Sequence, residues 1–437
     1  MKRSWLVASL VIAAASCRGE TKTKRSGSAA PVEIVTNLPD ATRGPGPSSD
    51  EAEPNDGDEV ASPVALGGTA RGKIDPETDV DYYRVDVDRA GALQVSLSAV
   101  EGVDLTLELV DASGTSLAKS DRGGVRVKEG FPNVGVTPGR YALIVKRAAK
   151  KAKPKPKKGA PEPAPAAAPA TAPTYELVTQ LVDPGKGGER EPDDDRGTAV
   201  DLIVGDNATG FIGWTGDRDV WKLSVETLSE KNVVDVQVSA VEGIALELEV
   251  SDGLGQPLAL RKAPKGKVIV LRGLMPTVAA GSPPFHYLTV RADKSNPETA
   301  YTLHATARVV GTDEELEPND LVDKPFVLPP ERRVIHATWS PGDIDCFAIA
   351  PAPAARTVDI AIDTPSEIDL AAELLIDGKS VAAANKGGKG VLEKLSGQVP
   401  ANAKAVIRVK NPDPNASVEA RYDVSVQESN AGGDNAP

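Results

Sequence analysis

A six-residue acidic motif occurs three times in this chain and limits the folds available to it. Glu-Ala-Glu-Pro-Asn-Asp at residues 51–56 returns as Glu-Arg-Glu-Pro-Asp-Asp at 189–194 and as Glu-Leu-Glu-Pro-Asn-Asp at 315–320. Each copy is followed, at the same spacing, by an Asp-x-Asp pair and then by an aromatic residue two positions further on. Chance does not produce this pattern, so the sequence predicts three homologous modules.

Alternating apolar and polar residues predict strands in every copy. The aromatics Tyr83, Trp221 and Phe347 start or join such runs, and they share the phase of the buried positions. Their neighbours Tyr82, Val220 and Cys346 are expected to face outward. A period of two is that of a sheet with one buried face, and turn residues separate the runs. The expected fold is all-β, with three tandem antiparallel β-sandwiches of jelly-roll-like type.

The module boundaries follow from matching the strands of the three copies. The second and third copies each end with two strands, so the Lys/Pro/Ala-rich stretch that precedes Tyr175 in the first copy is interpreted as an insertion in its final hairpin loop. The predicted parts are a tether at 17–50, modules at 51–183 (with the insertion at 146–173), 189–308 and 314–428, and a disordered tail at 429–437.

The N-terminus has the features of a signal peptide. Lys2 and Arg3 precede an apolar run that is too short for a permanent membrane span. The run ends in Ala-Ala-Ser-Cys, which resembles a lipobox, so residues 1–16 are expected to be removed and Cys17 to be acylated, with palmitate among its chains. The alternative is ordinary signal cleavage that leaves a free thiol. Arg18 after the cysteine favours an outer-membrane lipoprotein of the bacterial envelope.

Composition argues against two classes of function. The net charge of −13 disfavours a nucleic-acid partner, because a phosphate backbone favours a basic surface. The sequence contains no His-Glu-x-x-His and no Gly-x-Ser-x-Gly, and an enzyme is not expected. With only Cys17 and Cys346, no internal disulfide framework is possible. Cys346 is expected to be a bystander or, less favoured, to form an intermolecular disulfide.

Taken together, the motif, the Asp-x-Asp-x-aromatic run and the late Pro-Gly-Arg-Tyr at residues 138–141 resemble the bacterial pre-peptidase C-terminal (PPC) domain. The resemblance implies jelly-roll-like sandwiches of the kind appended to secreted peptidases, although no peptidase domain precedes them here. It also extends to the calcium-dependent collagen-binding modules of clostridial collagenases. In the second copy Asp193 replaces the asparagine of the motif.

The acidic residues are candidate calcium ligands, because calcium takes about six to eight oxygen ligands from carboxylates, amides and carbonyls. The alternative is that they accept backbone hydrogen bonds in Asx-turns. The resemblance implies the following candidates: Glu51, Glu53, Asn55, Asp56, Asp79 and Asp81; Glu189, Glu191, Asp193, Asp194, Asp217 and Asp219; Glu315, Glu317, Asn319, Asp320, Asp343 and Asp345.

The expected function is that of a non-catalytic, lipid-anchored envelope or surface protein. Its modules would bind an extracellular or envelope polysaccharide or protein. A structural or assembly spacer is the alternative, and a carboxylate hydrolase is the least favoured reading. A basic stretch could contact an anionic partner, or could simply be a solvated loop. Its residues are Lys150, Lys151, Lys153, Lys155, Lys157 and Lys158.

Overall fold

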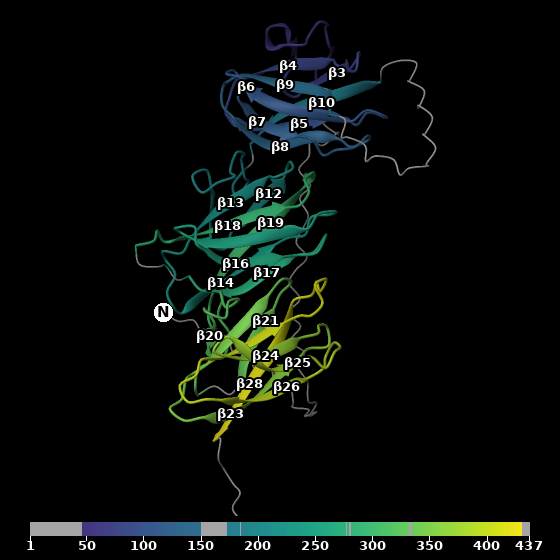
Figure 1. Ribbon diagram of the computed structural model, residues 1–437. Helices are drawn as coiled ribbons and strands as arrows, with labels where there is room; N and C mark the ends of the chain where they lie inside the picture. Colours follow the sequence, from purple (N-terminus) through teal and green to yellow (C-terminus); the bar gives the residue numbers. More distant parts are fainter. Residues whose placement is uncertain are drawn as a thin grey trace, which may run out of the picture. The chain divides into compact units, whose positions relative to one another are not determined.

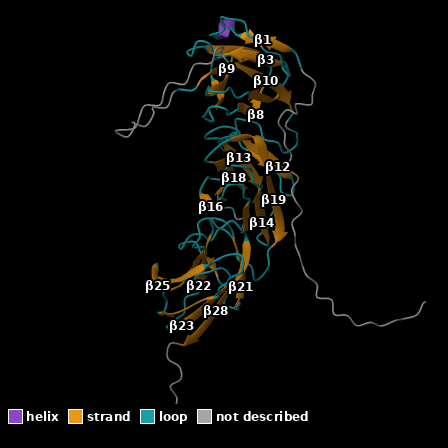
Figure 2. Ribbon diagram, turned by 90° about the vertical axis from the view of Figure 1, so that its right-hand side faces the viewer, coloured by secondary structure: helices purple, strands orange, loops and turns teal. Residues whose placement is uncertain are grey.

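Figure 1 shows the computed structural model of the chain, which describes residues 46–149, 173–183, 185–276, 278, 281–331 and 334–430. Strands dominate these residues, and the one helical element among them is a 3-10 turn, η1, at Asp58–Val60 (Figure 2). The all-β prediction is therefore confirmed. None of the described helical residues forms a helix long and apolar enough to span a membrane.

The strands fall into three segments, each with two sheets around its own apolar core. In the first segment the sheet orders are β1-β3-β10-β5-β8 and β2-β4-β9-β6-β7. Its strands are β1 Ser48–Asp50, β2 Ser62–Pro63, β3 Thr69–Lys73, β4 Val80–Val87, β5 Gly91–Leu97, β6 Leu105–Asp111, β7 Ser116–Ser120, β8 Glu129–Val136, β9 Gly139–Arg147 and β10 Thr174–Val182.

The second segment has sheet orders β12-β19-β14-β17 and β11-β13-β18-β15-β16. This is the order of the first segment without an equivalent of β1. Its strands are β11 Val200–Leu202, β12 Asn207–Ile212, β13 Arg218–Ser224, β14 Asn232–Val238, β15 Leu246–Asp252, β16 Pro257–Lys262, β17 Ile269–Leu274, β18 Phe285–Ala292 and β19 Asn296–Val309.

The third segment repeats the second, with sheet orders β21-β28-β23-β26 and β20-β22-β27-β24-β25. Its strands are β20 Phe326–Val327, β21 Val334–Trp339, β22 Ile344–Ile349, β23 Arg356–Asp363, β24 Ala371–Ile376, β25 Lys379–Ala384, β26 Glu393–Val399, β27 Ala405–Lys410 and β28 Ala420–Asn430. Pairing is antiparallel except at short edge strands such as β2, β11 and β20, which run parallel to their neighbours.

The alternation of the sequence places the cores as expected. Tyr83, Trp221 and Phe347 are fully buried, one in each core cluster, together with the apolar residues of the same phase. The expectation that Val220 and Cys346 face solvent is wrong, because both side chains are buried although they lie outside the core clusters. In the third segment the acidic motif lies against this face of the strand, since Cys346 Sγ is 3.7 Å from the Asp320 carbonyl oxygen.

The hairpin interpretation of the first module's insertion is also wrong. β9 pairs with β4 and β6, whereas β10 pairs with β3 and β5 in the other sheet. The chain between them therefore crosses from one sheet to the other. Sequence alternation shows that two strands exist, but it does not show whether consecutive strands pair side by side or face each other across the core.

An edge strand of each of the first two segments contacts the motif of the next. β8 has a register shift opposite Leu93/Val95, and β17 has one opposite Val234/Val236, at corresponding positions. Just past each bulge, Val134 forms a parallel bridge with Glu191 and Leu274 forms one with Glu317. The corresponding strand of the third segment, β26, pairs with β23 without a register shift.

Several sequence-based predictions lie outside the described residues. These are the signal peptide at 1–16, acylation of Cys17, most of the tether, the six lysines of the basic stretch and nearly all of the tail. The last residues assigned to the tether, Ser48–Asp50, form β1, which runs parallel to β3.

Candidate functional site

Each segment contains an acidic cluster, which we define as the two Glu and the Asn or Asp of its motif together with its Asp-x-Asp pair. The motif is fixed to the strand that carries the pair by a backbone hydrogen bond of the same kind in all three segments. The amides of Tyr82, Val220 and Cys346 donate to the carbonyls of Asn55, Asp193 and Asn319, at 3.0, 3.2 and 3.1 Å. The Glu-Pro peptide bond of each motif is cis.

The first Glu of each motif is held by a neighbouring strand. The Lys73 amide donates to Glu51 Oε1 at 2.9 Å, and the Phe211 and Thr338 amides donate to Glu189 and Glu315. The second Glu accepts from the amide two residues later, as in the 3.0 Å bond from Asp193 N to Glu191 Oε2. One oxygen of each carboxylate is thus fixed by the backbone, which sets the direction of the other.

The two aspartates of each pair have different partners. The first accepts a backbone amide in a turn: Asp75 N reaches Asp79 Oδ2 at 2.8 Å, and Asp217 and Asp343 accept equivalent bonds. These aspartates accept backbone amides as the alternative reading expects, but the donor amide precedes the aspartate by three or four residues, so the contacts are not Asx-turns. The second aspartate points into the cluster, and its partner is a tyrosine in the first and third segments. Tyr175 donates to Asp81 Oδ2, and Tyr422 donates to Asp345 Oδ2.

These tyrosines were not singled out from the sequence. Tyr175, Tyr301 and Tyr422 occupy the last strand of each segment, opposite the strand that holds the first Glu. The signal was present as a tyrosine that recurs near the end of all three copies. In the second segment Tyr301 accepts from Trp221 Nε1 at 2.9 Å and lies 3.4 Å from Glu189 Oε2.

At least two oxygens of each cluster are buried and have no hydrogen-bond partner among the described residues. Of the two that recur in all three clusters, one belongs to the fifth motif residue and the other to the second aspartate of the pair, and all six residues are 0% exposed. A buried acceptor without a donor destabilises a fold by about 1–3 kcal/mol. The atoms are Oδ1 of Asn55, Asp193, Asn319, Asp81, Asp219 and Asp345.

The same clusters bring carboxylate oxygens together. Three carboxylates in each segment have ligand atoms within 4.8 Å of one another: Glu51, Glu53 and Asp81; Glu189, Glu191 and Asp219; Glu317, Asp343 and Asp345. With the unpartnered amide or carboxylate oxygens, this is an all-oxygen donor set of the kind that calcium prefers. The residues therefore fit a hard divalent cation.

The clusters differ in how much solvent reaches them. Glu53 of the first cluster is exposed, whereas Glu191 and Glu317 are buried. The difference follows from the edge-strand contacts: Gly135 N donates to Glu191 O at 2.6 Å, and Met275 N donates to Glu317 O at 2.8 Å. In the second cluster Asn133 Nδ2 also reaches Glu189 Oε1 at 2.6 Å. Two clusters are thus covered by the segment that precedes them.

Burial disfavours the charged forms of these carboxyl groups. In the second cluster it raises the pKa of Glu191, Asp193 and Asp219 above the ordinary range, and neighbouring carboxylates raise each pKa further. In the first cluster burial raises the pKa of Asp81 to about 8, although the Tyr175 hydroxyl opposes the shift. Without a bound cation, the clusters hold protons that the unfolded chain releases.

This protonation predicts a pH dependence with a definite sign. Raised folded-state pKa values mean that the native state binds more protons than the unfolded state above about pH 4, so stability in chelator should fall as the pH rises toward 8. Calcium competes with those protons, so its stabilising effect should grow over the same range. Thermal melts at pH 5 and pH 8, with and without calcium, measure both slopes. A calcium effect that is equal at the two pH values would contradict this expectation.

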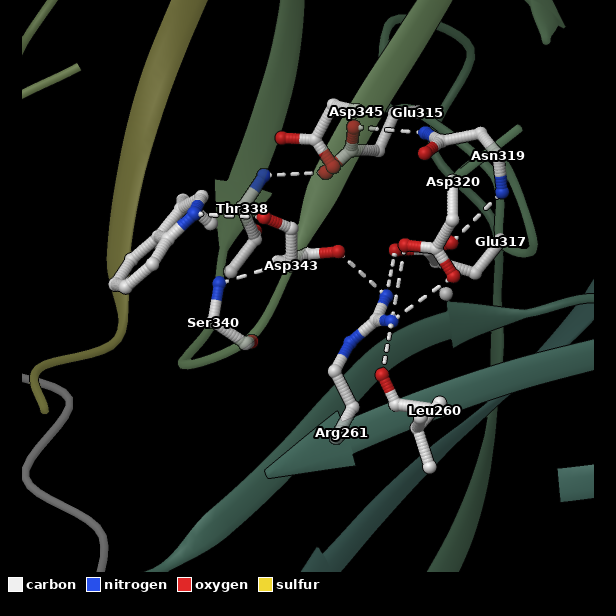
Figure 3. A network of polar contacts seen from close by, with 12 residues as sticks. Leu260, Arg261, Glu315, Glu317, Asn319, Asp320, Thr338, Ser340, Asp343 and Asp345 are labelled. Atoms are coloured by element: carbon white, nitrogen blue, oxygen red, sulfur yellow. Dashed lines mark hydrogen bonds and ion pairs between the residues drawn. The ribbon is translucent and has the colours of Figure 1, made fainter. Parts of the chain in front are cut away.

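The remaining candidate ligands lie at the margin of the clusters. Asp56 and Asp194 are exposed. Asp320 instead forms an ion pair with Arg261, which comes from β16 of the second segment and whose side chain is almost fully buried (Figure 3). This arginine was not identified from the sequence, because nothing near residue 261 suggests that it contacts Glu317, which lies 56 residues further along the chain.

The sequence matches no protein-family model and no curated protein. Among solved structures, the chain is similar to a pre-peptidase C-terminal domain of a Bacillus anthracis collagenase, with 20% identity, 30% of this chain and 100% of that chain covered, and a TM-score of 0.21. It is also similar to a putative secreted protein from Eubacterium rectale, with 10% identity, 58% and 80% coverage and a TM-score of 0.20.

A third similar structure is the N-terminal tandem CBM22 domain of Paenibacillus barcinonensis Xyn10C. It has 13% identity, covers 48% of this chain and 83% of that chain, and has a TM-score of 0.16. At these identities and scores, none of the three structures assigns a family or a ligand to this chain.

Proposed function

We propose that this chain is a non-catalytic envelope protein with three PPC-like modules, that calcium stabilises at least the first two of them, and that the modules bind an extracellular or envelope polysaccharide or protein. The observation that carries the calcium part is the recurrence, in all three acidic clusters, of two fully buried oxygens without a hydrogen-bond partner. Such groups are costly when unpaired, and a bound cation would satisfy them.

The calcium ligands would come from the motif and from the second aspartate of the pair. In the first segment they are Glu51, Glu53, Asn55 and Asp81, and in the second Glu189, Glu191, Asp193 and Asp219. The first aspartates, Asp79 and Asp217, serve to hold their turns through backbone amides. In this division the cluster contains both candidate ligands and aspartates that accept backbone amides.

Burial supports a non-catalytic role for the second and third clusters. Their carboxylates are covered by the preceding segment and by their own motif, so a polymer in solution cannot touch them. Hydrolysis of a polymer needs an acid and a base within hydrogen-bond reach of the scissile bond. In this proposal the clusters stabilise the fold, and a polysaccharide or protein ligand would bind to the outer faces of the sheets. Attachment to the outer membrane through an acylated Cys17 remains part of the proposal.

A spacer role is the second candidate, and contacts between segments favour it. Phe131 of the first segment packs edge-to-face on Trp214 of the second, with ring centroids 6.2 Å apart. Arg272 of the second segment pairs with Glu419 of the third at 2.9 Å. A binding protein should give saturable pull-down of an envelope glycan or protein that is lost on mutating one sheet face. A spacer should show no such binding and should fail only when its length is changed.

The test of the calcium proposal is a thermal melt of the purified protein in chelator and in calcium. A site occupied at one hundred times its dissociation constant adds about 2.7 kcal/mol to the free energy of unfolding. We expect the transition of the responding segments to move up with calcium, and to move much less with the same concentration of potassium chloride. Identical melts in chelator and calcium would remove calcium from the proposal.

A further inference from the structure

The third acidic cluster contains a positively charged side chain of the protein itself, Arg261. The Arg261 guanidinium lies between the carboxylates of the cluster, as Figure 3 shows. Its Nη2 is 2.5 Å from Glu317 Oε1 and 2.7 Å from Asp343 Oδ1, and its Nη1 is 3.0 Å from Asp320 Oδ1. The Arg261 side chain is 1% exposed, so these contacts are shielded from solvent.

No arginine occupies the corresponding place at the second cluster. Arg261 pairs with Leu248 across β15 and β16, and the matching pair across β6 and β7 is Leu107 with Ser120. Ser120 donates to Glu129 within its own segment. Among the described residues, no lysine, arginine or histidine forms an ion pair with Glu189, Glu191, Asp193 or Asp217. The second cluster therefore lacks the positive charge that the third receives from its neighbour.

We propose that Arg261 is a resident counter-ion that takes the place of a divalent metal in the third cluster and joins the second segment to the third. A planar guanidinium satisfies several carboxylates at once through its fixed fork of donors. A metal ion at the same oxygens would be repelled by the guanidinium at a distance of a few ångströms. Metal binding is thus confined to the first two clusters, an assignment that rests on the proposed calcium role.

A direct test counts the calcium ions bound by the purified protein and by its Arg261→Ser variant, which carries the residue found at the matching position 120. The probe is calcium alone, measured by equilibrium dialysis and by thermal melts in chelator and in calcium. We expect two ions in the wild type and three in Arg261→Ser. The variant should lose stability in chelator, and calcium should restore it, because the metal then fills the vacated cation position.

Two further variants separate a cation site from a simple structural contact. Arg261→Lys keeps the positive charge and should bind two ions, as the wild type does. Arg272→Ser removes a different ion pair between the same segments, the one with Glu419, and its loss of stability should not be restored by calcium beyond the wild-type response. If calcium rescues Arg272→Ser as well as Arg261→Ser, the rescue does not report on the cluster and the proposal is wrong.

The outcomes also distinguish this proposal from the calcium role itself. Three ions in the wild type, or an Arg261→Ser variant that stays unfolded or destabilised in calcium, would overturn the counter-ion assignment and leave the calcium proposal intact. No ions in the wild type but one in Arg261→Ser would overturn the calcium role of the first two clusters and support the counter-ion. No ions in either protein would overturn both.

Discussion

Replacing Asp219 with asparagine should stabilise the protein in chelator and remove most of the calcium effect of the second segment. Asp219 is fully buried, and neither of its carboxylate oxygens has a hydrogen-bond partner within the described part of the chain. Asparagine has nearly the same shape and is neutral without taking up a proton, so folding in chelator no longer requires protonation of this site, and the free energy of unfolding at neutral pH should rise by about 1–3 kcal/mol. In calcium the variant should instead be less stable than the wild type, because a charged ligand is lost.

The decisive result is that the change in the free energy of unfolding caused by Asp219→Asn has opposite signs in chelator and in calcium. Paired chemical-denaturation curves measure it. A matched control is Glu226→Gln, which neutralises an exposed carboxylate in the same segment and should shift both curves by less than about 0.5 kcal/mol. If Asp219→Asn is destabilising in chelator as well as in calcium, the aspartate is a satisfied structural residue and the cation site in this segment is refuted.

Replacing Trp221 with alanine should cost about 3–5 kcal/mol of stability, the range for removing a large aromatic side chain from a core. The indole is fully buried in the core of the second segment, and its Nε1 donates to Tyr301 at 2.9 Å. The substitution would leave a large cavity, and the Tyr301 hydroxyl beside the acidic cluster would lose the donor that Trp221 supplies. Urea titration followed by circular dichroism should therefore show an early transition for this segment.

The same titration tests whether each segment has its own core. Trp339 belongs to the core of the third segment, so its fluorescence should report a later transition that Trp221→Ala shifts little. Val309→Ala, at a residue that is 72% exposed, is the control and should change stability by less than about 0.5 kcal/mol. If circular dichroism and fluorescence of the Trp221→Ala variant both change in one transition at lower urea than in the wild type, the segments unfold together.

The sequence contained enough to predict the strands and the residues that gather at each site. Alternation with period two placed Tyr83, Trp221 and Phe347 in the cores, because a strand buries every second side chain. The resemblance to the PPC domain implied that the carboxylates of the motif meet the Asp-x-Asp pair, and Glu189, Glu191 and Asp219 do come together in the second segment. Repetition showed which residues recur in all three copies.

Contacts between strands that are distant in the sequence could not be predicted from alternation or repetition. Cys346 was expected to face outward, but a sheet face is covered or open according to where the chain runs next, and local alternation carries no information on that path. Arg261 was missed for a related reason. Its partners Glu317 and Asp343 belong to another segment, so its role depends on which edge of one segment contacts the next.

The edge strands β8 and β17 contain bulges, whereas β26 pairs regularly, so the last unit of the array differs from the two before it. A bulge turns the edge strand so that the second Glu of the following motif can hydrogen-bond beside it, and β26 of the last segment has no such bulge. Terminal units of repeat proteins differ from internal ones in this manner. A longer version of the protein should therefore be obtainable by duplicating the middle unit. A unit appended after the last one would lack a bulged edge strand with which its motif could pair.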